Sequence, residues 1–318
     1  MDRKSLVRAA VLPVVWLALY AIGYLMLPEA FGSPRNIETI IRQTIIVGFA
    51  SIGMTFVIAA AMIDLSVGSA VALVTVAVAT ALKAGWSPGM AALAGIVAAI
   101  AVGAFNGLLV TRLKVGAFVV TLASLLAVRG TAKGIAHETK IDANLTWLND
   151  LTAALNAKTS WMLLPIGGWL VIVFAILGAL ILHRTVFGRN VIAIGSNPEA
   201  AHLSGISVSR VQLGVYLLAG IFVGMAGVSQ FARLSVGDPT VAEGLELNVI
   251  AAVVIGGASL SGGSGSIFGS LIGALIMTTI NTIGSQAGWP TWIQAIVTAV
   301  IILVAVGLDR LRSSRTSG

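Results

Sequence analysis

Long apolar runs recur from one end of the chain to the other, and they limit the fold more than any other feature. A helix needs roughly 20 apolar residues to cross a bilayer, and the 318-residue chain has about ten such runs. They occupy approximately residues 11–28, 44–62, 66–84, 90–111, 117–136, 161–182, 211–231, 246–260, 266–286 and 291–308. The sequence therefore predicts an all-α polytopic integral membrane protein, with one transmembrane domain over residues 1–318.

Composition supports this prediction and excludes several other classes of protein. Only 10% of the residues are charged, whereas a soluble domain has roughly 25%. The chain has no cysteine, so disulfide frameworks and thiol chemistry are excluded. The net charge of +7 is typical of basic residues that flank membrane spans, and we expect membrane lipid rather than nucleic acid as the partner.

The charged ends of the chain predict its orientation in the membrane. An even number of spans places both termini on one side, and the basic ends "MDRKSLVR" and "DRLRSSR" indicate the cytoplasm. The polar loop at about 137–160 then lies outside, and the segment at about 183–210 lies inside. Leucine and tryptophan recur at helical spacing in the outer loop, so a helix on the membrane surface and an ordinary loop are both open.

Titratable side chains are scattered, which argues against an enzyme. The three histidines have no metal-ligand spacing, and the chain has no Gly-Lys pair and hence no Walker A phosphate loop. We expect no catalytic residue, no metal and no cofactor in this chain. If ATP drives its function, a separate ATPase chain must bind the nucleotide.

One carboxylate lies at the junction of two apolar runs, in "MIDLSVGSAVAL". A charged side chain within a membrane is costly, so Asp64 is a candidate functional residue. Asp64 or Ser66 also suits the cap of a new helix, where it would accept hydrogen bonds from free backbone N–H groups. Both interpretations predict a helix break that faces protein or a pathway rather than lipid.

Three asparagines within apolar runs are further candidates for a pathway or for bonds between helices: Asn106, Asn248 and Asn281. Asn106 in "GAFNGLLV" and Asn281 in "GALIMTTINTI" each follow small residues, in expected spans that are five apart. Spans five apart run in opposite directions, as in transporters with inverted repeats. Small residues four apart, such as Gly103 and Gly107, favour close helix packing within the subunit or across a dimer face.

The stretch "FGRNVIAIGSNPEAAHLSGISVSR" contains a short polar helix between two long apolar ones. Asn197 suits the N-cap, Pro198 the first helical position, Glu199 the first turn, and Gly205 the left-handed stop. We expect a small apolar face of Ala200, Leu203 and Ile206. Such a short helix is not stable alone, so it must pack against its own domain, a partner or both.

Several segments, in order along residues 40 to 308, resemble the permease subunits of bacterial ABC importers of the ribose, xylose, arabinose and autoinducer-2 type. They are "IDLSVGS", "NGLLVTRLKV", "VTLASLLAVRG", "FGRNVIAIGSNPEAAHLSGISV" and "ELNVIAAVVIGGASLSGGSGSIFGSLIGA". The resemblance implies a type II-like permease in the bacterial plasma membrane. It also implies that one helix docks in a groove of the ATPase as the coupling helix, formed by Asn197, Pro198, Glu199, Ala200, Ala201, His202, Leu203, Ser204 and Gly205.

The expected function is therefore transport of a monosaccharide or a similar small polar solute. The expected partners are an ABC ATPase subunit, an extracytoplasmic solute-binding protein and a second permease copy or paralogue. A branched-chain amino acid or nucleoside permease is the alternative within this class. A secondary carrier or channel that needs no ATPase is the alternative from another class.

Overall fold

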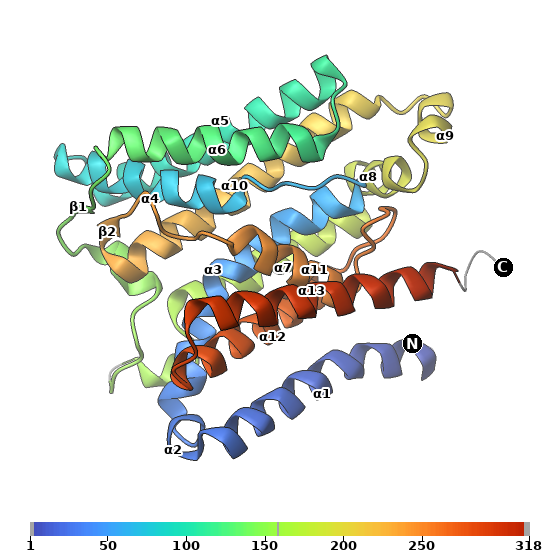
Figure 1. Ribbon diagram of the computed structural model, residues 1–318. Coiled ribbons are helices and arrows are strands. Elements are labelled where there is room, and N and C mark those ends of the chain that lie inside the picture. Colours follow the sequence, from blue (N-terminus) through green and yellow to red (C-terminus); the bar gives the residue numbers. More distant parts are fainter. Residues whose placement is uncertain (1–2, 158, 315–318) are drawn as a thin grey trace.

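The computed structural model describes residues 3–157 and 159–314 of the chain, and these residues are mostly helical (Figure 1). The longer helices are α1 (Arg3–Met26), α3 (Pro34–Ala59), α4 (Val67–Lys83), α5 (Pro88–Leu113), α6 (Ala117–Ile135), α7 (Ile166–Arg184), α8 (Val186–Ser196), α10 (Val208–Leu234), α11 (Leu245–Ile255), α12 (Ile267–Gln286) and α13 (Thr291–Ser314). The short elements are α2 (Pro28–Phe31), α9 (Pro198–Leu203), the 3-10 helices η1 (Trp147–Leu151) and η2 (Ser160–Met162), and the strands β1 (Ile141–Asp142) and β2 (Val236–Gly237).

Each expected span coincides with one helix. Among the described residues, six helical segments are long and apolar enough to cross a membrane. They cover Pro34–Ala59, Pro88–Leu113, Ala117–Ile135, Ser160–Arg184, Val208–Leu234 and Ile267–Gln286. Four shorter apolar helical stretches occupy the remaining expected positions: Val11–Met26, Val67–Lys83, Leu245–Ile255 and Thr291–Gly307. The protein is thus a polytopic membrane protein.

The core lies around α3, α4 and α10. From Ile45 to Ala59 every residue of α3 is buried, because α7, α10, α11 and α12 surround this helix. By contrast, α5, α6 and α7 expose large apolar side chains on one face, such as Phe105, Leu126 and Ile176. An exposed apolar face of this kind suits contact with lipid.

Close backbone contact joins α5 to α10. A Cβ atom on Gly103 would lie 2.3 Å from the carbonyl oxygen of Tyr216, and one on Gly220 would lie 2.9 Å from the carbonyl oxygen of Ala99. Only glycine allows two helices to approach so closely. The expected packing of these small residues within one subunit is therefore confirmed for Gly103, and Gly220 packs in the same way.

Two long helices are each followed by a non-helical segment and then a shorter helix. We call residues 60–66, between α3 and α4, the first break, and residues 235–244, between α10 and α11, the second break. Figure 1 shows that α3 and α10 run in opposite directions, as do α4 and α11. This arrangement supports the inverted repeat suggested by Asn106 and Asn281.

The outer loop forms no long surface helix. It contains the two-residue strand β1, which pairs antiparallel with β2, and the five-residue helix η1. Leu148 of η1 is buried, and the side-chain amide of Asn149 donates hydrogen bonds to the carbonyl oxygen of Ala232 and the hydroxyl of Ser235. The loop therefore covers the end of α10 and the start of the second break.

Figure 1 places the first turn of α1 and the last turn of α13 at the same side of the bundle as α9. The strands β1 and β2 lie at the opposite side. The described ends of α1 and α13 and the short polar helix α9 thus lie on one side of the bundle.

Candidate functional site

The first break is organised by Asp64. Ala61 has a left-handed backbone conformation with φ of 57°, which ends α3 and redirects the chain. Asp64 is only 5% exposed, and its Oδ1 accepts hydrogen bonds from the backbone N–H of Ser66 at 2.8 Å and from the hydroxyl of Ser66 at 2.6 Å. The break and the capping role expected of Asp64 are therefore present. The side chain of Ser66 forms no cap of its own on α4.

The first break is bonded to α5 and α6. The side-chain amide of Asn106 donates a hydrogen bond to the hydroxyl of Ser66 at 2.9 Å, and the Ser124 hydroxyl donates to the carbonyl oxygen of Asn106. The hydroxyl of Thr121 donates to the backbone oxygen of Ile63 at 3.2 Å. Ser124 and Thr121 were not singled out in the sequence. They lie three residues apart in "VVTLASLLAV" and so share one face of a helix, a pattern that indicates a polar contact with a neighbouring helix.

Asn248 and Asn281 meet in a second place. The Asn281 amide on α12 donates to the side-chain oxygen of Asn248, in the first turns of α11, at 3.3 Å. Each half of the molecule thus has an asparagine that bonds to the start of the helix after a break. The five candidate residues form two groups, with Asp64, Ser66 and Asn106 in one and Asn248 and Asn281 in the other.

The starts of α4 and α11 touch each other. A Cβ atom on Gly68 would lie 2.3 Å from Oε2 of Glu246 and 2.4 Å from the backbone oxygen of Ala242. Glu246 is 9% exposed, and among the described residues its Oε2 has no hydrogen-bond partner. The sequence analysis missed Glu246, although an acidic residue inside the apolar run "LELNVIAAVVI" is a signal of the same kind as Asp64.

Basic side chains hold the second break in place. Nη1 of Arg129, on α6, donates hydrogen bonds to the backbone oxygens of Pro239 at 2.9 Å and Val241 at 2.7 Å. Lys140, in the outer loop, forms an ion pair of 3.2 Å with Asp238. Both breaks are therefore bonded to α6 or to the loop that follows it.

The pKa of Asp238 is lower than the ordinary value for an aspartate. Burial raises the pKa of Asp238, but hydrogen bonds from the side chain and backbone of Thr240, together with the Lys140 ammonium, lower it by more. The result is a pKa below the ordinary value of 3.8. The ionised carboxylate thus stabilises the turn that begins the second break.

The short polar helix α9 has the caps expected from the sequence. Oδ1 of Asn197 accepts a hydrogen bond from the N–H of Ala200 at 2.9 Å, Pro198 is the first helical residue, and Gly205 has φ of 84°. The helix is held on its own domain by Ala201, which is buried at 5% exposure.

The expected apolar face of α9 is only partly correct. Ile206 packs against the core of its own chain, whereas Ala200 and Leu203 are exposed, with Leu203 at 87%. Glu199, His202 and Ser204 are exposed as well. The six-residue helix cannot turn Ala200, Leu203 and Ile206 to one common surface, because Gly205 reverses the chain between them. The surface available to a partner is therefore centred on Leu203.

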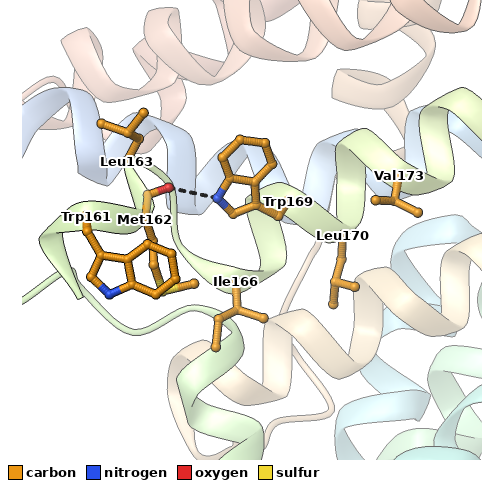
Figure 2. Close-up of a pocket in the computed structure, with 7 residues that line it drawn as sticks. All are labelled: Trp161, Met162, Leu163, Ile166, Trp169, Leu170 and Val173. Atoms are coloured by element: carbon orange, nitrogen blue, oxygen red, sulfur yellow. Dashed lines mark hydrogen bonds between the residues drawn. The ribbon is translucent and has the colours of Figure 1, made fainter. Parts of the chain in front are cut away.

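A groove of about 360 Å³ lies at the start of α7 (Figure 2). Its lining is formed by Trp161, Met162, Leu163, Ile166, Trp169, Leu170 and Val173. The indole N–H of Trp169 donates to the backbone oxygen of Met162 at 2.8 Å, as Figure 2 shows. The only polar side-chain groups of this lining are the two indole N–H groups, so the groove suits lipid chains rather than a polar solute. Tryptophans gather at membrane interfaces for the same reason.

No group of three or more metal-ligating side chains occurs within the ranges 3–157 and 159–314. Buried polar side chains of those ranges occur at the two breaks and also on α3, α10 and α12, such as Thr55, Gln230 and Thr279. The polar groups at the first break bind α5 and α6 to it, which is a common role of polar side chains inside membrane proteins.

Comparison with known proteins agrees with this geometry. A family model described as "Branched-chain amino acid transport system / permease component" matches residues 36–306. The chain belongs to this permease family. No solved structure matches the permease.

Three similar proteins are sugar permeases. The permease is 36% identical to the L-arabinose ABC transporter permease protein AraH of Azospirillum brasilense, over 98% of this chain and 90% of the relative. It is 39% identical to the ribose import permease protein RbsC of Bacillus subtilis (strain 168), over 95% and 93%. It is 34% identical to the xylose transport system permease protein XylH of Escherichia coli (strain K12), over 90% and 88%.

Proposed function

We propose that this chain is the membrane-spanning permease of an ATP-driven importer, and that its substrate is a monosaccharide. The observation that carries the proposal is the identity of 34% to 39% with permeases named for arabinose, ribose and xylose, over most of each chain. The protein is a multi-pass protein of the bacterial inner membrane and acts as a transport subunit.

In the proposed assembly the chain crosses the membrane about ten times, with both termini in the cytoplasm. α4 and α11 begin inside the membrane, because their 17 and 11 residues give lengths of about 26 Å and 16 Å, less than the roughly 30 Å of the hydrocarbon core. A helix that starts at membrane depth is tolerated where it is covered by protein or lines a cavity. The buried Asp64 and Glu246 beside these helix starts fit that requirement.

The proposed partners are an ATPase subunit, an extracytoplasmic solute-binding protein and a second permease copy or paralogue. α9 is the coupling helix, with Leu203 as the side chain that enters a groove of the ATPase. The binding protein delivers the sugar to the opposite side, where β1 and β2 lie. Alternating access then follows from movement of the two halves of the assembly, and no bond of the substrate is broken here.

Uptake into reconstituted vesicles tests this proposal. The permease is reconstituted with its ATPase and binding protein, and ATP-dependent uptake of arabinose, ribose and xylose is measured. Leucine and a nucleoside are tested in parallel, since the family description names branched-chain amino acids. Uptake of a sugar that stops without ATP supports the proposal. Uptake of leucine or the nucleoside instead, or uptake without an ATPase, contradicts it.

A further inference from the structure

Three backbone segments meet beside α9 without any side chain between them. Gly195 lies in the last turn of α8, Ala59 is the last residue of α3, and Gly263 lies in the glycine-rich turn between α11 and α12. The N–H of Gly263 donates a hydrogen bond to the backbone oxygen of Ala59 at 3.0 Å. We call Gly195, Ala59 and Gly263 the glycine junction.

The glycine junction is too tight for any other residue at position 195. A Cβ atom there would lie 1.9 Å from the backbone oxygen of Ala59 and 2.6 Å from the backbone nitrogen of Gly263. Both neighbours are backbone atoms, so no change of side-chain rotamer relieves the clash. The three segments would have to move apart, and the hydrogen bond between Ala59 and Gly263 lies at the point of separation.

Each segment of the junction leads directly to an element described above. Gly195 is followed after one residue by Asn197, the cap of α9. Ala59 is followed by the first break, which carries Asp64. Three residues after Gly263 lies Ser266, whose hydroxyl oxygen caps α12 by accepting from the N–H of Gly269. The junction therefore joins the helix proposed to meet the ATPase to the first break and to the start of α12.

We propose that the glycine junction transmits the movement of α9 to the first break and to α12, and that it stays closed throughout the transport cycle. Backbone segments in direct contact behave as one rigid body, because a close-packed interior transmits displacement and has no free volume in which to absorb it. The tight glycine contacts between α5 and α10 join two helices along their length instead. This proposal rests on the proposed role of α9 as the coupling helix.

Two variants test the junction: a substitution that forces it apart, which we call the wedge, and a disulfide that holds it closed, which we call the staple. The wedge is Gly195→Ala, and its control is Gly89→Ala, an exposed helical glycine whose added Cβ meets only the Trp147 ring at 3.9 Å. The staple is the double substitution Ala59→Cys and Gly265→Cys, which joins α3 to the glycine-rich turn. A Cβ atom on Gly265 lies 3.4 Å from the Cβ of Ala59, close to the 3.5–4.5 Å range of a disulfide. The chain has no other cysteine.

For each variant we would measure its amount in the membrane, the ATPase that co-purifies, ATP hydrolysis with and without loaded binding protein, and sugar uptake. We expect Gly195→Ala to keep the ATPase and to lose uptake by tenfold or more, together with the stimulation of hydrolysis. Gly89→Ala should behave as the unmodified chain. Oxidation of the staple should change uptake by less than twofold relative to the same variant after reduction.

Two results would overturn the proposal. One is uptake at the unmodified rate by Gly195→Ala that retains its ATPase. The other is loss of uptake when the staple is oxidised and recovery when it is reduced, because the junction would then have to open. If Gly195→Ala does not accumulate in the membrane, uptake by the oxidised and reduced staple variant alone tests the proposal. Failure of the unmodified chain to take up sugar with ATP counts against the proposed function and not against the junction.

Discussion

The side-chain amide of Asn106 bonds to the hydroxyl of Ser66 across the interface between α5 and the first break, at 2.9 Å. Ser66 in turn donates to Asp64, and Asn106 accepts from Ser124. One asparagine therefore links three helical elements through a fully buried chain of hydrogen bonds. Each group in the chain has its partner, which removes the cost of burying it.

Replacing Asn106 by leucine should destabilise the permease. The substitution leaves the Ser124 hydroxyl without its acceptor, and a buried unpaired polar group costs about 1–3 kcal/mol. Thermal unfolding in detergent measures the loss. Thr111→Val is the matched control on α5, because the Thr111 hydroxyl bonds only within its own helix. Equal melting temperatures for the two variants would show that the network is dispensable.

Asp64→Leu should impair transport or assembly, because it removes the acceptor that holds Ser66 and leaves the first break without its turn. Asp64→Asn should be milder, since it retains an oxygen at the same place. Membrane abundance and sugar uptake are the measurements. Normal uptake by Asp64→Leu at normal abundance would mean that the carboxylate serves neither folding nor transport.

Leu203→Arg should weaken binding of the ATPase while leaving the permease folded, because the Leu203 side chain is exposed and contributes little to the permease itself. Co-purification of the ATPase and stimulated hydrolysis measure the effect. Leu145→Arg is the control, since Leu145 is 78% exposed at the opposite side. Retention of the full complex by Leu203→Arg argues against α9 as the coupling helix.

Two other substitutions on α9 should differ in their effect on membrane abundance. Ala201→Arg places a long cation at a buried position and should lower membrane abundance as well as ATPase binding. Glu199→Lys reverses a charge that favours the start of a helix, which is worth typically about 0.3–1 kcal/mol, so its effect should be small. Abundance on an immunoblot separates the two. An Ala201→Arg variant as abundant as Glu199→Lys would contradict the burial of Ala201.

Labelling of single cysteines should reveal the orientation, and the chain offers a cysteine-free background. A membrane-impermeant maleimide should label Ala157→Cys in intact cells. The same reagent should label His202→Cys only after the membrane is opened, because α9 lies in the cytoplasm in the proposed topology. Both positions are exposed. Labelling of both in intact cells would refute this topology.

Lowering the pH should reduce the stability that Asp238 gives to the second break. The folded-state pKa of Asp238 is lowered, so its ionised form contributes stability above the ordinary pKa of 3.8 and loses it as the pH falls further. Asp238→Asn should flatten this part of the stability profile, with a change of about 0.2–1 kcal/mol for the partly exposed pair with Lys140. Melting temperatures between pH 6 and pH 3 measure it, and Glu243→Gln is the exposed control.

The sequence predicted the positions of the helices well, because each long apolar run stands between polar turns. It also predicted the caps of α9, since Asn197, Pro198 and Gly205 act through local backbone geometry. It did not pair Asn106 with Ser66, because that contact depends on how α5 crosses the first break. Arg129 was missed for the same reason, as its partners Pro239 and Val241 lie in the second break. Glu246 was missed although its position inside an apolar run was a signal of the same kind as Asp64. The surface helix suggested by the pattern in the outer loop became the short helix η1, because β1, Leu148 and Asn149 tie that loop to α10.

The side chains that bond to the first break are synthesised after it. Asp64 and Ser66 emerge before Asn106 and Ser124, and Glu246, which lies against Gly68, emerges much later still. A nascent chain that ends after α4 therefore presents a carboxylate and unbonded backbone groups to whatever surrounds it. Stable insertion of α4 has to await α5 and α6, so the unit of membrane insertion in this part of the chain is a group of helices and not a single helix.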